Sequence, residues 1–149
     1  MTVIGLTLNK EDVYKEVKKT TNYTGAKMND AGAWSRISTT EADNEMLERF
    51  WQESKSIVCN KLKRVLSEEN EISGEWKIEL NLSKSYDDTL TESIEHSLFS
   101  FFVMNITAKW YTFSNKDEST GYATEAATYI EDIMRKAYFK KKPTRPTYD

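Results

Sequence analysis

The chain has 149 residues, of which 38% are hydrophobic, 12% aromatic and 30% charged, and its net charge is −3. This length suits one domain with a core of its own, and the aromatic content excludes disorder over most of the chain. A net charge this small excludes a field that draws nucleic acid to the whole molecule.

The single cysteine, Cys59, has no partner for an internal disulfide, and its helical context predicts a small buried hydrophobe. The N-terminal residues MTVIGLTLNKED lack the basic and apolar regions of a signal peptide. The longest apolar run, Leu98 to Met104, is interrupted by Ser100 and falls far short of the ~20 residues that span a bilayer. We therefore expect a soluble, intracellular protein.

The first helix is predicted to begin at Asn9, a suitable N-cap, with Glu11 and Asp12 favourably placed in its first turn. It is expected to end near Thr20 or Thr21, because Asn22-Tyr23-Thr24-Gly25 favours a turn. Residues 25–38 are expected to form a loop anchored by Trp34 and Ile37.

The second helix is predicted from a start that resembles a capping box, residues 40–43, to about Ser67. Its apolar residues recur at helical spacing, namely Met46, Leu47, Phe50, Trp51, Ile57, Val58, Leu62, Val65 and Leu66.

A strand is predicted at residues 75–82, where Trp76, Ile78, Leu80 and Leu82 alternate with polar residues. A lone strand is unstable, so it needs a partner. The partner is either the segment from Thr2 to Leu8 or a neighbouring subunit.

After a polar turn at 83–89, two more helices are predicted, at about 91–113 and 116–139, followed by a basic extended tail at 140–149. The expected fold is therefore mainly α, with about four helices in a bundle and a small β-strand or hairpin insertion at about 75–82. Residues 1–139 form the domain and residues 140–149 the tail.

No enzyme, cofactor or metal site is predicted. His96 is the only histidine, and with Glu92 and Glu95 alone it falls short of a zinc ligand set, so it is expected at the surface or in helix packing. Asp87 and Asp88 follow the strand and are expected to form a turn rather than a catalytic pair.

The basic C-terminus has two possible roles. Its cations either favour a helix end and a solvated tail, or they dock on an acidic protein surface or a nucleic acid backbone. The candidate docking residues are Lys140, Lys141, Lys142, Arg145 and Tyr148, next to Arg135, Lys136, Tyr138 and Phe139.

The helix at 91–113 carries aromatic residues on more than one face. It is expected to be a central helix packed by the others, with a subunit interface as the second possibility. The candidate interface residues are Phe99, Val103 and Phe113, with Trp76 from the strand.

Three motifs together resemble the head–tail connector (adaptor) proteins of tailed phages and prophages. An opening LTLNKEDVYKEV precedes the long segment DNEMLERFWQESKSIVCNKLKRVL, and a later helix closes on an aromatic pair in ITAKWYTFSNKDE. The resemblance covers most of the chain except residues 68–90, where the strand looks like an insertion.

The resemblance implies a structural virion protein that assembles in the cytoplasm of the bacterial host. Its homo-oligomeric ring of about a dozen subunits would join the portal protein to a downstream tail protein, with DNA only as passing cargo and no membrane partner. The C-terminal segment, from Lys140 to Asp149, would then dock on a neighbouring ring. The alternative is a helical regulatory or nucleic-acid-binding module that uses the basic C-terminus.

Overall fold

The computed structural model describes residues 2–27, 44–114 and 116–140. Within these ranges it contains the strands β1 (Thr2–Asn9), β2 (Leu66–Ile72) and β3 (Glu75–Leu82). Its helices are α1 (Lys10–Lys27), α3 (Asn44–Lys61), the short 3₁₀ helix η2 (Asp88–Leu90), α4 (Thr91–Ser114) and α5 (Lys116–Ala137). The expectation of a mainly helical fold with a small β element is confirmed.

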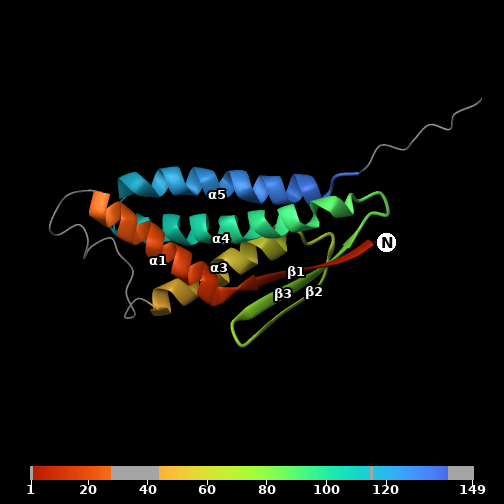
Figure 1. Ribbon diagram of the computed structural model, residues 1–149, viewed down its shortest axis with the longest axis horizontal. Coiled ribbons are helices and arrows are strands. Elements are labelled where there is room, and N and C mark those ends of the chain that lie inside the picture. Colours follow the sequence, from red (N-terminus) through yellow and green to blue (C-terminus); the bar gives the residue numbers. More distant parts are fainter. Residues whose placement is uncertain (1, 28–43, 115, 141–149) are drawn as a thin grey trace, which may run out of the picture.

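The three strands form one antiparallel sheet in the order β1-β3-β2. β1 pairs with β3 along its whole length, from Thr2 opposite Leu82 to Asn9 opposite Glu75. The segment from Thr2 to Leu8 is thus the intramolecular partner of the predicted strand. Figure 1 shows the sheet on one side of the helices, with α4 and α5 side by side above it.

Strand β2 and the end of the preceding helix differ from the prediction. Helix α3 ends at Lys61 rather than near Ser67, and β2 forms a hairpin with β3. The connection is a two-residue turn in which Ser73 and Gly74 have φ values of 54° and 79°. This conformation suits a tight hairpin turn. The pairing with β3 outweighs the weak helical pattern of residues 62–67.

Helix α1 begins as predicted, because the Asn9 side chain accepts a 3.1 Å hydrogen bond from the backbone N–H of Asp12. It continues past its predicted end to Lys27. The Thr20 and Thr21 hydroxyls donate to carbonyls one turn back in the same helix, which leaves these polar groups satisfied without a turn. Trp34 and Ile37 lie outside the described residues.

Helix α4 is the central helix, as expected. The side chains of Ile94, Leu98, Phe102 and Ile106 are fully buried, and α4 packs against α1, α3, α5 and β1. The Phe102 ring lies 4.9 Å from that of Trp51 on α3 and 5.4 Å from that of Trp76 on β3, measured between centroids. This aromatic contact is where the helices and the sheet share one core.

Candidate functional site

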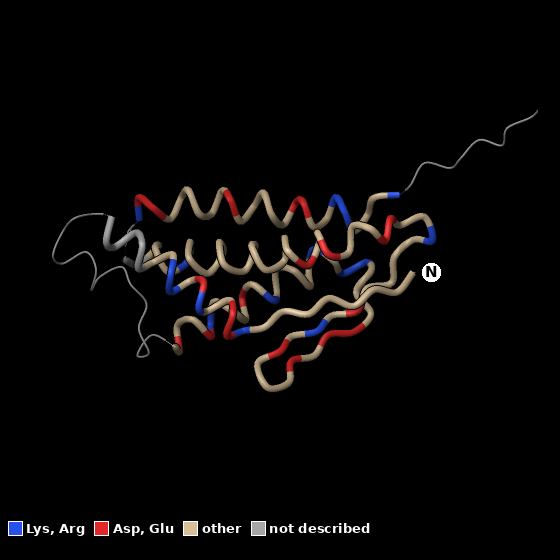
Figure 2. Tube along the Cα trace, in the orientation of Figure 1, with Lys and Arg blue, Asp and Glu red and all other residues tan. Residues whose placement is uncertain are grey.

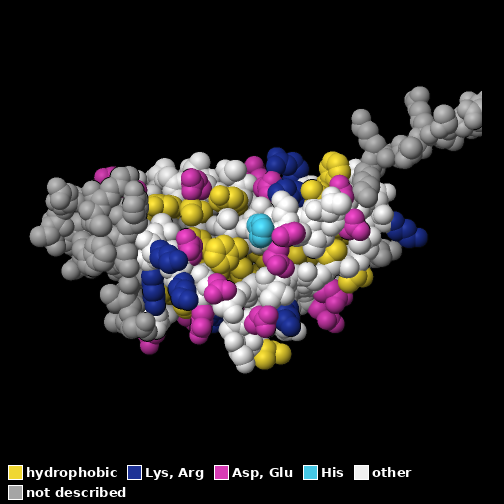
Figure 3. All heavy atoms as spheres, viewed as in Figure 1, with side chains coloured by type: hydrophobic (Ala, Val, Ile, Leu, Met, Phe, Trp, Pro, Cys, Tyr) yellow, Lys and Arg dark blue, Asp and Glu magenta, His cyan; other side chains and the backbone are white. Residues whose placement is uncertain are grey.

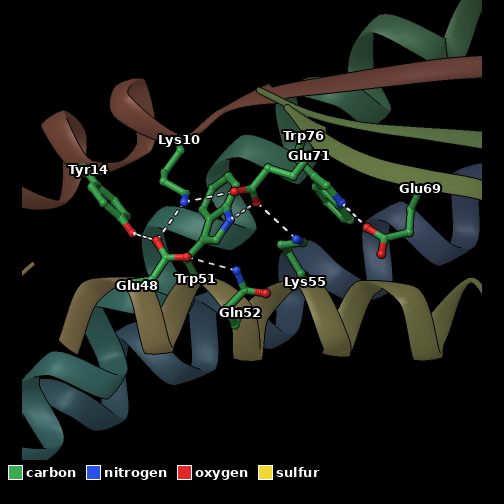
Figure 4. A network of polar contacts seen from close by, with 9 residues as sticks. All are labelled: Lys10, Tyr14, Glu48, Trp51, Gln52, Lys55, Glu69, Glu71 and Trp76. Atoms are coloured by element: carbon green, nitrogen blue, oxygen red, sulfur yellow. Dashed lines mark hydrogen bonds and ion pairs between the residues drawn. The ribbon is translucent and has the colours of Figure 1, made fainter. Parts of the chain in front are cut away.

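A connected polar network joins the β2–β3 hairpin to helices α1 and α3 (Figure 4). The Glu71 carboxylate accepts a 2.6 Å hydrogen bond from the indole N–H of Trp51. It also forms ion pairs with Lys10 at 3.0 Å and with Lys55 at 3.1 Å. Glu71 thereby ties strand β2 to the start of α1 and to the middle of α3.

The network continues through Glu48 on α3. Its carboxylate pairs with Lys10 at 2.7 Å and accepts hydrogen bonds from the Tyr14 hydroxyl and from the Gln52 amide, both at 3.0 Å. Lys10 therefore bridges two carboxylates that belong to different elements, Glu48 on α3 and Glu71 on β2.

A second tryptophan is bound in the same way one step along the hairpin. The indole N–H of Trp76 donates a 2.6 Å hydrogen bond to the carboxylate of Glu69. The ammonium group of Lys55 lies 5.8 Å from the Trp76 ring, and that of Lys10 lies 5.6 Å from the Trp51 ring. Each of these lysines thus adds a cation–π contact to an ion pair.

Three groups of this network have pKa values shifted away from neutrality. Burial alone raises the pKa of Glu71, but hydrogen bonds from Trp51, Lys10 and Lys55 outweigh it and bring the value to about 2. Burial and the neighbouring Glu48 raise the pKa of the Tyr14 hydroxyl. Burial lowers the pKa of Lys10, but its bonds to Glu48 and Glu71 prevail and raise it.

These pKa shifts suit a structural network better than a catalytic centre. A general acid or base works best with a pKa near the operating pH. Glu71, Tyr14 and Lys10 are each held further from neutrality than their ordinary values. These three groups are therefore better suited to holding β2 in place than to exchanging a proton at neutral pH.

A hollow of about 760 Å³ lies beside the network, between the N-terminal half of α1 and the start of α3. The described side chains that line it balance three lysines against three glutamates, so their charges favour neither an anion nor a cation. They are Lys10, Lys15, Lys18, Glu11, Glu45 and Glu48, with Tyr14 and Asn44.

The residues weighed for chemistry have structural positions. His96 is exposed on α4 with Glu92 at 4.0 Å, and Figure 3 shows its imidazole on the surface in cyan. Asp87 caps helix η2, because its side chain accepts hydrogen bonds from the N–H and the hydroxyl of Thr89. Cys59 is only half-buried rather than buried, and burial raises the pKa of its thiol.

Part of the predicted basic cluster is neutralised within the fold. Arg135 and Lys136 both pair with the Asp132 carboxylate, at 2.7 Å and 2.6 Å. Lys140 is exposed and forms an isolated β-bridge with Tyr86. The other candidate docking residues, Lys141, Lys142, Arg145 and Tyr148, lie outside the described residues.

The candidate interface residues are mostly inside the chain. Trp76 is 0% exposed and Val103 is 2% exposed, so neither presents a surface to a second subunit. Both pack into the chain's own core because β3 is the central strand and α4 the central helix. Phe99 is half-buried against the core, and the side chain of Phe113 lies outside the described part.

The residues of the network were not predicted from the sequence. Glu69 and Glu71 lie in LSEENEI, a segment with few of the β-branched and aromatic residues typical of strands. The available signal was Ser73-Gly74 before the alternating strand, which is a hairpin turn pattern. Reading that turn would have placed both glutamates on one face of β2.

No protein-family model matches the chain, and no curated protein and no solved structure is significantly similar to it. None of the described helices is long and apolar enough to cross a membrane. Within the described ranges, no group of three or more His, Cys, Asp and Glu side chains is placed to hold a metal ion.

Proposed function

We propose that the chain is a structural protein of a phage or prophage, a subunit of the ring that connects the head to the tail. The sequence motifs supply the connector assignment. The observation that carries the structural role is the position of three exposed apolar side chains at opposite ends of the sheet. Ile72 is 69% exposed, Val3 is 57% exposed and Phe139 is 47% exposed.

These side chains lie at two different ends of the sheet, and each end is called a patch below. Ile72 lies beside the hairpin turn, where it pairs with Glu75. Val3 pairs with Asn81 at the far end of β3, and Phe139 lies near that end because the next residue, Lys140, forms a β-bridge with Tyr86, which follows β3. The two ends are about 20 Å apart at the rise of an antiparallel strand. A ring needs a heterologous contact between two unlike patches, and this chain offers such a pair.

The polar network supports the same role. Its charged groups are bonded to one another and to two indoles, so it stiffens the hairpin that carries Ile72. A rigid edge suits a subunit that must repeat one contact around a ring. In the proposed assembly the portal protein and a downstream tail protein lie on either side, and DNA passes through without a specific site.

The test is the assembly state of the purified full chain, measured by native mass spectrometry and electron microscopy over a range of concentrations. We expect rings, and we expect Ile72→Asp or Phe139→Asp to reduce them without lowering the melting temperature. The matched control is His96→Asp, an exposed position away from both patches, which should leave the rings intact. A chain that stays monomeric at high concentration, alone and with its portal protein, contradicts the proposal.

The alternative, a nucleic-acid-binding module, is separated by a second measurement. Such a module shows DNA affinity that falls steeply with salt and is lost when Lys140, Lys141 and Lys142 are replaced by alanine. The pairing of Arg135 and Lys136 with Asp132 gives this alternative less support, because the Asp132 carboxylate offsets one of their two positive charges.

A further inference from the structure

The two edges of the sheet differ in how they are closed. At the β1 edge, the backbone N–H of Thr7 points away from β3 and donates a 3.1 Å hydrogen bond to the Glu95 carboxylate of α4. At the β2 edge, no backbone pairing outward from Glu69 or Glu71 occurs in the part of the chain that the structure describes. One backbone N–H of the β1 edge is thus capped by α4, whereas no described group pairs with Glu69 or Glu71 at the β2 edge.

The register shows which groups are open. The two-residue turn makes Ile72 and Glu75 a hydrogen-bonded pair, and the pairs then alternate along the hairpin. Asn70 therefore bonds to β3, whereas the N–H and C=O groups of Glu69 and Glu71 point outward. Four backbone groups are left for another extended segment.

The open edge is acidic. Glu68, Glu69 and Glu71 belong to β2, and Figure 2 shows acidic positions along this strand. Lys10 and Lys55 compensate Glu71, whereas Glu68 and Glu69 form no ion pair among the described residues. Two copies of β2 facing each other would bring like charges together, which is destabilising. An extended segment that pairs here needs basic residues.

The chain has such a segment, and it starts beside this edge. Residues 141–149 read KKPTRPTYD. They follow Lys140, which lines a hollow of about 190 Å³ together with Arg64 and Val65, the residues just before β2. The Arg64 guanidinium lies 5.6 Å from the Tyr138 ring centre, which holds the end of the described chain to the start of β2.

We propose that residues 141–145 add to the β2 edge of their own chain as a fourth strand, parallel to β2. The lysines and the arginine of this segment then face Glu68 and Glu69. Pro143 has no N–H, so its nitrogen faces solvent while Lys142 and Thr144 pair inward. Pro146, unlike Pro143, falls at an inward-facing position, and because it has no N–H it ends the pairing. The added strand covers an edge that otherwise invites association, and this holds whether or not the chain is a connector.

The test is amide hydrogen exchange of the full chain at low concentration. We expect the amides of Glu69 and Glu71 to be protected, and about fivefold faster exchange in the variant Lys141→Glu/Lys142→Glu, since each bond lost is worth ~1 kcal/mol. The amide of Asn70, which bonds to β3, should not change. The control variant Lys15→Glu/Lys19→Glu makes the same charge change on α1 and should leave both amides protected.

A second variant separates strand pairing from charge attraction. Thr144→Pro keeps every charge but removes one inward N–H, so it should also speed the exchange of the Glu69 and Glu71 amides. Equal exchange of these amides in the wild-type chain and in both tail variants overturns the proposal. Protection that disappears on dilution, with a fall to monomer mass, also overturns it and assigns the strand to a second copy. Neither result bears on whether rings form.

Discussion

Strands β1 and β2 flank the same central strand but are attached to the rest of the molecule by different forces. β1 turns Ile4, Leu6 and Leu8 into the core, all three buried. β2 turns Glu69 and Glu71 inward and bonds them to the indoles of Trp76 and Trp51. The stabilisation that comes from apolar burial depends little on salt or pH, whereas the stabilisation that comes from ion-paired carboxylates depends on both.

This difference teaches how one sheet accommodates an acidic strand. A buried charge is tolerated when it is paired and hydrogen-bonded, and Glu71 has two lysines and an indole as partners. The same arrangement satisfies the two tryptophan N–H groups inside the core. The hairpin is held firmly, and its outer edge remains polar.

The largest effect is expected on the apolar side, at Leu6, which is 1% exposed. Leu6→Ala should cost about 3 kcal/mol of unfolding free energy, because it leaves a cavity between β1 and the helices. Urea denaturation followed by circular dichroism measures it. The loss of unfolding free energy should be the same at low and high salt. A strong salt dependence would contradict the conclusion that β1 is held by apolar burial and β2 by charged groups.

The next effect is expected at Glu71. Glu71→Gln should cost about 2 kcal/mol, because two lysines lose their shared carboxylate while the side chain keeps its size. The control is Glu68→Gln, which removes the same charge from the exposed face of β2. Equal costs for the two variants would show that Glu71 acts only through net charge.

The pH dependence of stability tests whether the ionised Glu71 carboxylate is the source of this contribution. The folded pKa of Glu71, about 2, lies below its ordinary value of 4.5, so its contribution is fully present above about 4.5. It is lost as the pH falls from 4.5 towards 2. The stability difference between the wild type and Glu71→Gln should therefore shrink over this window. A constant difference from pH 6 to pH 2.5 would exclude the ionised Glu71 as its source.

The smallest effect is expected at the β1 edge. Glu95→Ala should cost about 1 kcal/mol, because the N–H of Thr7 loses its acceptor. Glu92→Ala is the matched control on the same helix, since that side chain is 86% exposed. Thermal melts of the two variants and the wild type give the comparison, and identical melting temperatures would mean that water replaces Glu95 at this edge.

The strongest periodic signals predicted the structure well. The alternation from Trp76 to Leu82 correctly indicated a strand with one buried face, and the apolar density of α4 indicated a central helix. The capping residue Asn9 marked the start of α1. Each of these signals is local, because the side chains that decide it lie within a few turns of one another.

The prediction failed where distant residues decide the local structure. β2 has little strand propensity of its own and exists because β3 supplies a ladder of hydrogen bonds and two indoles supply partners for its glutamates. The candidate interface residues Trp76 and Val103 illustrate a related point. Their apolar character was evident, but only the packing shows that the chain itself covers them.

The sequence by itself determined the mainly helical class, the central strand and the aromatic core helix, because hydrophobic periodicity sets which faces must be buried. Only the tertiary structure decided that Lys10, Glu48 and Glu71 meet, that β2 lies beside β3 at one side of the sheet, and that no described strand pairs with its other side. These features join segments far apart in the chain. Their contribution to stability depends on which charged groups and strands pair, and on how far these groups are removed from water. The hydrophobic pattern of the sequence encodes neither.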